Sequence, residues 1–142
     1  GVMQVEFAAG LGRLRTLAFL PDGNTLVSAG EGRVIVLWDV RSGDEVSRFT
    51  CASGKVLSMA VCGEELIATG GSDNLVHVWD RRTGREVERL AGHTGSVAAL
   101  AYDTASNSVI SGSYDTTVRV WRVGAASGQN TATDAKPNQR VR

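Results

Sequence analysis

The sequence has no surplus of charge of either sign, little proline or cysteine, and no long hydrophobic run. Its 142 residues include 15 Lys and Arg against 15 Asp and Glu. A nucleic-acid-binding domain needs a basic face or stripe, so we expect no nucleic-acid partner. A membrane span needs about 20 apolar residues in a row, so we expect none. No basic and apolar leader is present, and we expect an intracellular protein.

Cysteine and histidine are too sparse to form the usual chemical sites. Cys51 and Cys62 are not in a CxxC pair, which predicts reduced and inert thiols. No metal-ligand cluster occurs, and no glycine-rich phosphate loop followed by Lys-Ser/Thr. We therefore predict no metal, no cofactor and no enzymatic activity.

What the sequence does contain is a repeat. Trp38, Trp79 and Trp121 recur 41 and 42 residues apart, with matching phrases around them: TLVSAG, LIATGG and VISGSY, then VIVLWD, LVHVWD and TVRVWR. Short β-branched runs separated by Gly and Asp turns are typical of strands. The PDGN turn suits a hairpin, and Gly43 and Gly84 lie where a positive φ is expected.

These features resemble the WD40 repeat family of β-propellers. Three in-register repeats, the Trp38-Asp39 and Trp79-Asp80 pairs and the Gly92-His93 pair carry the resemblance. It implies an all-β fold of about three blades, each a four-stranded antiparallel sheet with strands a to d from hub to rim. The predicted organisation is an outer strand of another blade at 1–8, blades at 9–50, 51–91 and 92–123, the last with strands a to c only, and a disordered tail at 124–142.

The ends of the chain raise the question of how such blades close into a ring. Val2–Phe7 aligns with the outer strands EVSRF and REVERL, while the third repeat lacks an outer strand. The family closes its ring when an N-terminal outer strand completes the last blade, which removes a sheet edge. Closed propellers usually have four to eight blades. Two interpretations stay open: a fragment of a longer propeller, or two copies that assemble a six-bladed ring. Open flanks would also allow copies to associate.

Ser111, His93 and Asp115 could be read as a catalytic triad, but the repeat argues against it. The second unit reuses the aspartate without a histidine, and the serine lies inside a β run. The resemblance instead implies a buried hydrogen-bonded tetrad within a blade, formed by His93, Ser111, Asp115 and Trp121. The incomplete counterparts are Thr69, Asp73 and Trp79 in the second unit, and Ser28 and Trp38 in the first.

Two further polar positions have simpler interpretations. Gly10 and Ala52 occupy the histidine position of the first and second units, and Gly32 the aspartate position of the first. His77 is predicted to be a partly exposed strand residue, where the third unit has Arg119. Asp39 and Asp80 are predicted to cap the turns that follow them.

A propeller binds through its loops. The resemblance implies contact positions beside the first strand of each unit and before the b–c turn. Mapped here, they are Arg13, Arg15, Glu31, Lys55, Leu57, Ser72, Ser96, Ala98 and Tyr114. The basic side chains favour an acidic or phosphorylated peptide, and Tyr114 is the aromatic anchor.

Two functions fit this pattern. The first is a non-catalytic protein–protein interaction scaffold that binds a protein or peptide. The second is the regulatory or substrate-recruiting part of a longer multidomain enzyme, such as a ubiquitin-ligase or kinase assembly, because one fold serves many tasks.

Overall fold

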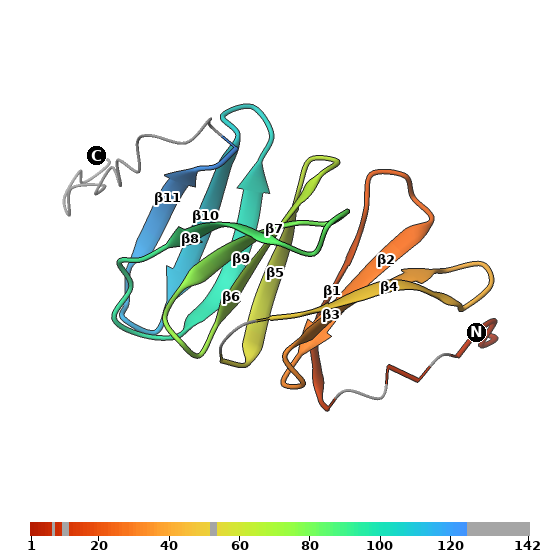
Figure 1. Ribbon diagram of the computed structural model, residues 1–142. Helices are drawn as coiled ribbons and strands as arrows, with labels where there is room; N and C mark the ends of the chain where they lie inside the picture. The colour runs from red at the N-terminus through yellow and green to blue at the C-terminus, as the bar shows by residue number, and fades with distance from the viewer. Residues whose placement is uncertain (7, 10–11, 52–53, 125–142) are drawn as a thin grey trace.

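The computed structural model describes residues 1–6, 8–9, 12–51 and 54–124, and within them the protein is all-β. Three antiparallel sheets stand in a row in chain order (Figure 1). The first sheet, blade 1, contains β1 (Leu14–Phe19), β2 (Thr25–Gly30), β3 (Val34–Asp39) and β4 (Glu45–Thr50).

The second and third sheets repeat this plan. Blade 2 contains β5 (Val56–Cys62), β6 (Leu66–Gly71), β7 (Val76–Asp80) and β8 (Glu86–Leu90). Blade 3 contains β9 (Val97–Asp103), β10 (Ser108–Ser113) and β11 (Val118–Arg122). The strand order follows the chain in every sheet, so β11 is the outer strand of a three-stranded blade.

The turns follow from their sequences. Leu20 N–H donates to Thr25 O at 2.9 Å, which closes the predicted PDGN hairpin. Gly43 and Gly84 have φ of 78° and 68°, which confirms the left-handed conformation expected of them. Asp39 and Asp80 each accept backbone N–H bonds from the next turn, at 2.8 Å from Arg41 and Arg82, so the predicted caps are also confirmed.

Apolar packing joins the blades. Val27, Ile35 and Leu37 of blade 1 pack against Met59, Ile67 and Trp79 of blade 2. Ala68, Val76 and Val78 on the other face of blade 2 pack against Val97, Val109 and Trp121 of blade 3. Each inner blade face therefore supplies one half of a core that lies between two sheets.

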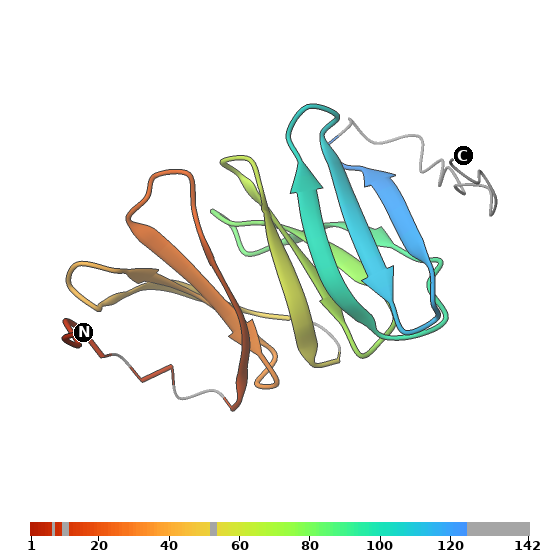
Figure 2. The ribbon, with the colours of Figure 1, turned by 180° about the vertical axis from the view of Figure 1, so that it is seen from behind.

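The row of blades is an open arc. In both views the N-terminal segment lies beside blade 1, and β11 lies at the opposite end (Figures 1 and 2). None of the described residues 1–6 is in a strand, and Val2 and Met3 are 90% and 73% exposed. The outer strand expected at 1–8 thus has no sheet partner in the single chain, and its assignment to a blade stays a prediction.

Several predicted features lie outside the described residues. They are Phe7, the histidine-position residues Gly10 and Ala52, and all of the tail beyond Gly124.

Candidate functional site

Blade 3 brings together four polar side chains from three different segments. Ser111 lies in the central strand β10 and is fully buried, and Trp121 lies beside it in β11. Asp115 lies in the turn between these strands, and His93 lies in the loop before β9. The antiparallel register pairs Trp121 with Val109, two residues before the serine, and from there the indole N–H reaches the serine hydroxyl.

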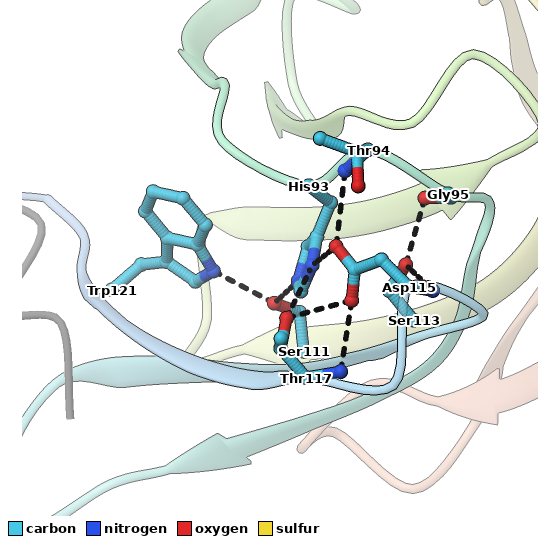
Figure 3. A network of polar contacts seen from close by, with 8 residues as sticks. All are labelled: His93, Thr94, Gly95, Ser111, Ser113, Asp115, Thr117 and Trp121. Carbon is cyan, nitrogen blue, oxygen red and sulfur yellow. Dashed lines mark hydrogen bonds and ion pairs between the residues drawn. The ribbon is translucent and has the colours of Figure 1, made fainter. Parts of the chain in front are cut away.

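The contacts form one continuous chain (Figure 3). Trp121 Nε1–H donates to Ser111 Oγ at 2.8 Å, and Ser111 Oγ lies 2.7 Å from His93 Nε2. On the other side of the ring, His93 Nδ1 lies 2.8 Å from Asp115 Oδ2. A carboxylate accepts only, so Nδ1–H donates to Asp115; in the neutral imidazole, Nε2 is then the acceptor for the Ser111 hydroxyl hydrogen.

Asp115 also ties the loop to the turn. Its carboxylate accepts from the backbone N–H groups of Thr94 and Thr117 at 3.0 and 2.9 Å. The Thr117 hydroxyl donates to it at 2.7 Å. The Thr117 hydroxyl bond, then the backbone bonds and His93, lower the pKa of Asp115 against the opposing effect of burial. Thr117 is not singled out by the sequence analysis. The feature of the sequence that could identify it is a hydroxyl residue two positions after the turn aspartate.

The geometry does not present a nucleophile. Ser111 has no exposed surface, and its oxygen is enclosed by Trp121 on one side and His93 on the other. Acyl transfer needs a serine open to substrate and donors aimed at the developing oxyanion. The described atoms of this cluster instead satisfy one another.

Blade 2 has a different arrangement, and the interpretation of His77 as a partly exposed strand residue is wrong. Trp79 Nε1–H donates to Thr69 Oγ1 at 2.9 Å, as in blade 3. His77, however, is only 4% exposed, and its Nε2 lies 2.8 Å from Asp73 Oδ2. A histidine from β7 therefore contacts the turn aspartate, which in blade 3 is contacted by a histidine from the loop.

The second nitrogen of His77 reaches a residue that sequence reasoning missed. His77 Nδ1 lies 3.1 Å from Glu86 Oε2, and Arg89 Nε donates to Glu86 Oε1 at 2.7 Å. Burial raises the pKa of Glu86, but hydrogen bonds from Arg89 and His77 outweigh it and leave the pKa lowered. The available signal is weak: a histidine four residues after the turn aspartate.

Blade 1 keeps the smallest version of the network. Trp38 Nε1–H donates to Ser28 Oγ at 2.8 Å, and both residues are buried. Gly32 occupies the position of the turn aspartate and supplies no side chain. The pairs predicted from the repeat are thus in contact in all three blades, through 10-residue spacings.

The predicted contact residues lie along one edge of the row, where the first strand of each blade begins and the b–c turn lies. Backbone bonds hold the pairs together: Glu31 N–H to Arg13 O and Tyr114 N–H to Ser96 O, both at 3.0 Å. In blade 2, Lys55 N–H donates to Ser72 Oγ at 2.9 Å. Leu57 and Ala98 are half-buried at the starts of β5 and β9. We call these nine residues the loop face.

Charge on the loop face is partly paired. Arg15 Nε donates to Glu31 Oε1 at 3.0 Å, and Lys55 Nζ lies 3.5 Å from Glu31 Oε2. The Arg15 hydrogen bond is the main reason that the pKa of Glu31 is lowered, with burial opposing it and Lys55 assisting. Glu31 therefore links blades 1 and 2, and the two cations Arg15 and Lys55 share its carboxylate. Tyr114 is 74% exposed.

The remaining chemistry of the described residues is limited. No group of three or more His, Cys, Asp and Glu side chains in the described ranges could hold a metal ion. In the same part of the chain, no helix is long and apolar enough to span a bilayer. Cys51 and Cys62 are buried free thiols, and burial raises their pKa to about 12 and about 11.

Comparison with known proteins now decides the family. A family model described as WD domain, G-beta repeat, matches residues 7–39, 43–80 and 84–122. The chain belongs to the WD40 repeat family. The first matched segment contains β1–β3, the second β4–β7 and the third β8–β11, so the second and third segments each begin with the outer strand of the preceding blade. WD40 repeats generally serve as scaffolds for protein interaction.

Solved WD40 structures agree with this assignment. U3-55K is 26% identical with a TM-score of 0.71, and the match covers 78% of this chain and 36% of that one. The WD40 repeats of RRP9 are 27% identical with a TM-score of 0.73, covering 78% of this chain and 35% of that one. The chain thus spans about a third of the length of these two proteins. A search of curated proteins finds no match.

Proposed function

We propose that this chain is a non-catalytic scaffold that binds an acidic protein or peptide segment through its loop face. The observation that carries the proposal is the gathering of Arg13, Arg15 and Lys55 on one edge of adjacent blades, with the Glu31 carboxylate between Arg15 and Lys55. The net charge of these four side chains is +2. An exposed tyrosine on the same edge adds the kind of side chain that dominates binding energies.

The fixed backbone of the loop face supports the proposal. The bonds between Glu31 and Arg13, between Ser72 and Lys55, and between Tyr114 and Ser96 hold each turn against the start of its first strand. A surface that is ordered before binding loses less conformational entropy on association. The three blades therefore offer a preformed edge along which an extended acidic segment can lie.

The balanced charge of the whole chain supports a protein partner over nucleic acid. The loop-face cations are few, and two of them, Arg15 and Lys55, share Glu31, whereas phosphate-backbone binding needs a larger basic stripe. The free thiols support the intracellular location expected from the sequence, since thiols persist in reducing compartments.

Binding to a library of acidic, phosphorylated and neutral peptides tests this function. We expect acidic peptides to be selected, and Tyr114→Ala and Arg13→Glu each to weaken the selected peptide by about tenfold or more. Arg82→Ala is the matched control, because Arg82 pairs with Glu65 at the opposite edge of blade 2. Equal binding by all variants, or preference for neutral peptides, would refute the loop-face assignment.

A further inference from the structure

Each end of the row of blades has an apolar sheet face with no neighbour among the residues that the structure describes. On blade 3, Val118 and Val120 are 64% and 42% exposed, beside exposed Ala99 and Ala101. On blade 1, Leu17 and Phe19 are 57% and 55% exposed. Elsewhere in the molecule, the equivalent apolar faces of adjacent blades pack against each other.

The repeat identifies what each open face is shaped to meet. Val76 and Val78 occupy the positions of Val118 and Val120 in blade 2, where blade 3 covers them completely. Met59 of blade 2 occupies the position of Leu17 and is buried against blade 1. The outer face of blade 3 is therefore the counterpart of a face that receives a following blade. The outer face of blade 1 is the counterpart of a face that covers a preceding one.

In its described residues, blade 3 also lacks the fourth, outer strand that blades 1 and 2 have. β3 pairs with β4 and β7 pairs with β8, while within the described part of the chain β11 has β10 alone as its strand neighbour. The N-terminal segment aligns with β4 one repeat earlier, and β11 corresponds to β3. If the segment pairs with β11 in the register that β4 has on β3, Val5 lies opposite Val120 and Glu6 lies opposite Arg119. In blades 1 and 2, the residues at the position of Glu6 are Arg48 and Arg89, opposite Val36 and His77.

The charge at this position suits blade 3. An arginine at the position of Glu6 would lie opposite Arg119, and like charges directly opposite one another destabilise a sheet. Glutamate at position 6 supplies the opposite charge instead, and Val5 opposite Val120 makes an apolar pair.

The segment that fits β11 lies far from it in its own chain. Residues 1–6 lie beside blade 1, at the other end of the open arc from β11 (Figures 1 and 2). From these observations we propose that two copies of the chain join head to tail. The outer face of blade 1 in each copy covers blade 3 of the other, and residues 2–6 pair with the partner's β11.

The joint so formed repeats the internal ones. Two three-bladed arcs closed this way make a ring of about six blades, which is within the range that closed propellers adopt. Closure by a two-fold axis uses the same contact twice and leaves no further open face for association.

Sedimentation equilibrium of the full chain tests the association. We expect twice the 15.0 kDa mass of one chain. Val118→Glu should weaken the association about tenfold or more by placing a charge in the joint. Val87→Glu is the matched control, because Val87 is 49% exposed in a blade that already has a neighbour on both faces. A wild-type mass of one chain, or a Val118→Glu variant that associates as tightly as wild type, would overturn the proposal.

Oxidative cross-linking tests the strand pairing independently of any effect on folding. We expect the Val5→Cys, Val120→Cys variant to form a covalent dimer and the Val5→Cys, Val87→Cys control not to. The native thiols do not compete, because Cys51 and Cys62 are buried with pKa values of about 12 and about 11. A disulfide within one chain, a ladder of higher multiples, or no cross-link would each overturn the two-copy ring.

Discussion

The Asp115 carboxylate connects segments that are distant in the sequence. It contacts the loop before β9 through His93 and Thr94, and the turn before β11 through Thr117. A buried acceptor in such a network is costly to leave without donors, whereas each bond adds only modest net stability. The network is therefore worth most as a constraint that holds one loop conformation.

We predict that His93→Ala lowers the free energy of unfolding by about 1–3 kcal/mol, measured by urea denaturation. The reason is that Ser111 and Asp115 each lose their imidazole partner. Thr94→Ala is the control, since Thr94 contacts Asp115 through its backbone N–H, which alanine retains. An unchanged midpoint for His93→Ala would contradict a structural role for the network.

We predict a similar loss, about 1–3 kcal/mol, for His77→Val. Valine fits this position sterically, because Val36 occupies it in blade 1 and is buried there. The loss would then come from the contacts with Asp73 and Glu86. A double-mutant cycle with Glu86→Gln should give a combined effect smaller than the sum of the two single effects. Strict additivity would show that the contact between His77 and Glu86 contributes nothing.

At the scale of strands and blades, the repeat made much of the architecture predictable. Tryptophan spacing, β-branched runs and Gly or Asp turns are local signals, and they located the strands around Trp38, Trp79 and Trp121. The Ser or Thr partner of each tryptophan followed from the same register.

The burial of His77 could not be predicted in the same way, because it depends on contacts outside its own strand, with Glu86 of β8 and, through Trp79, with blade 1. Trp79, whose ring stacks on His77, also packs against Phe49 of blade 1. The prediction of a partly exposed His77 is based on Arg119, which occupies the same position in blade 3 and is half-buried there. Repeats share local pattern but not neighbours, so exposure at one position does not transfer to the next.

The contact between blades 2 and 3 depends on a glycine. A Cβ at Gly70 would lie 2.5 Å from Val97 Cγ1 and 2.8 Å from Ser58 Oγ. We predict that Gly70→Ala destabilises the chain by about 1–3 kcal/mol through overpacking, measured by thermal unfolding.

Gly112 is the matched control, because it has the same position in blade 3 on the open face. A Cβ there would meet only Ala99 Cβ, at 3.5 Å. Gly112→Ala should be tolerated at protein concentrations where the chain sediments as a monomer. If both substitutions destabilise the monomer equally, the effect belongs to the strand and not to the contact between blades.

For the whole molecule, the carboxylates set the response to acid. Every carboxyl group with a resolved shift has its pKa lowered by hydrogen bonds or ion pairs: Asp22, Glu31, Asp39, Glu45, Asp80, Glu86, Asp103 and Asp115. A lowered folded-state pKa gives stability that is present above the ordinary values of 3.8 and 4.5 and is lost as the pH falls.

We therefore predict that the melting temperature is nearly constant from neutral pH to about pH 5 and falls steeply below about pH 4. Thermal unfolding followed by circular dichroism at a series of pH values measures this. Asp115→Asn should show a shallower acid decline than wild type, because asparagine cannot be protonated there. A melting temperature that is constant or rises below pH 4 would contradict the assignment.

The strand pairings within the chain join strands of one sheet, while the sheets meet mainly through apolar side chains. The backbone pairing of the strands is thus complete within each blade's own sheet and does not depend on the neighbouring blade. The energetics of such an array reduce to nearest-neighbour terms. Recombination that inserts or deletes one whole repeat unit in a gene of this kind would replace one apolar contact between blades by another. It would leave the hydrogen-bond pairing within each sheet intact. Blade number is therefore the property of this architecture that can change most freely.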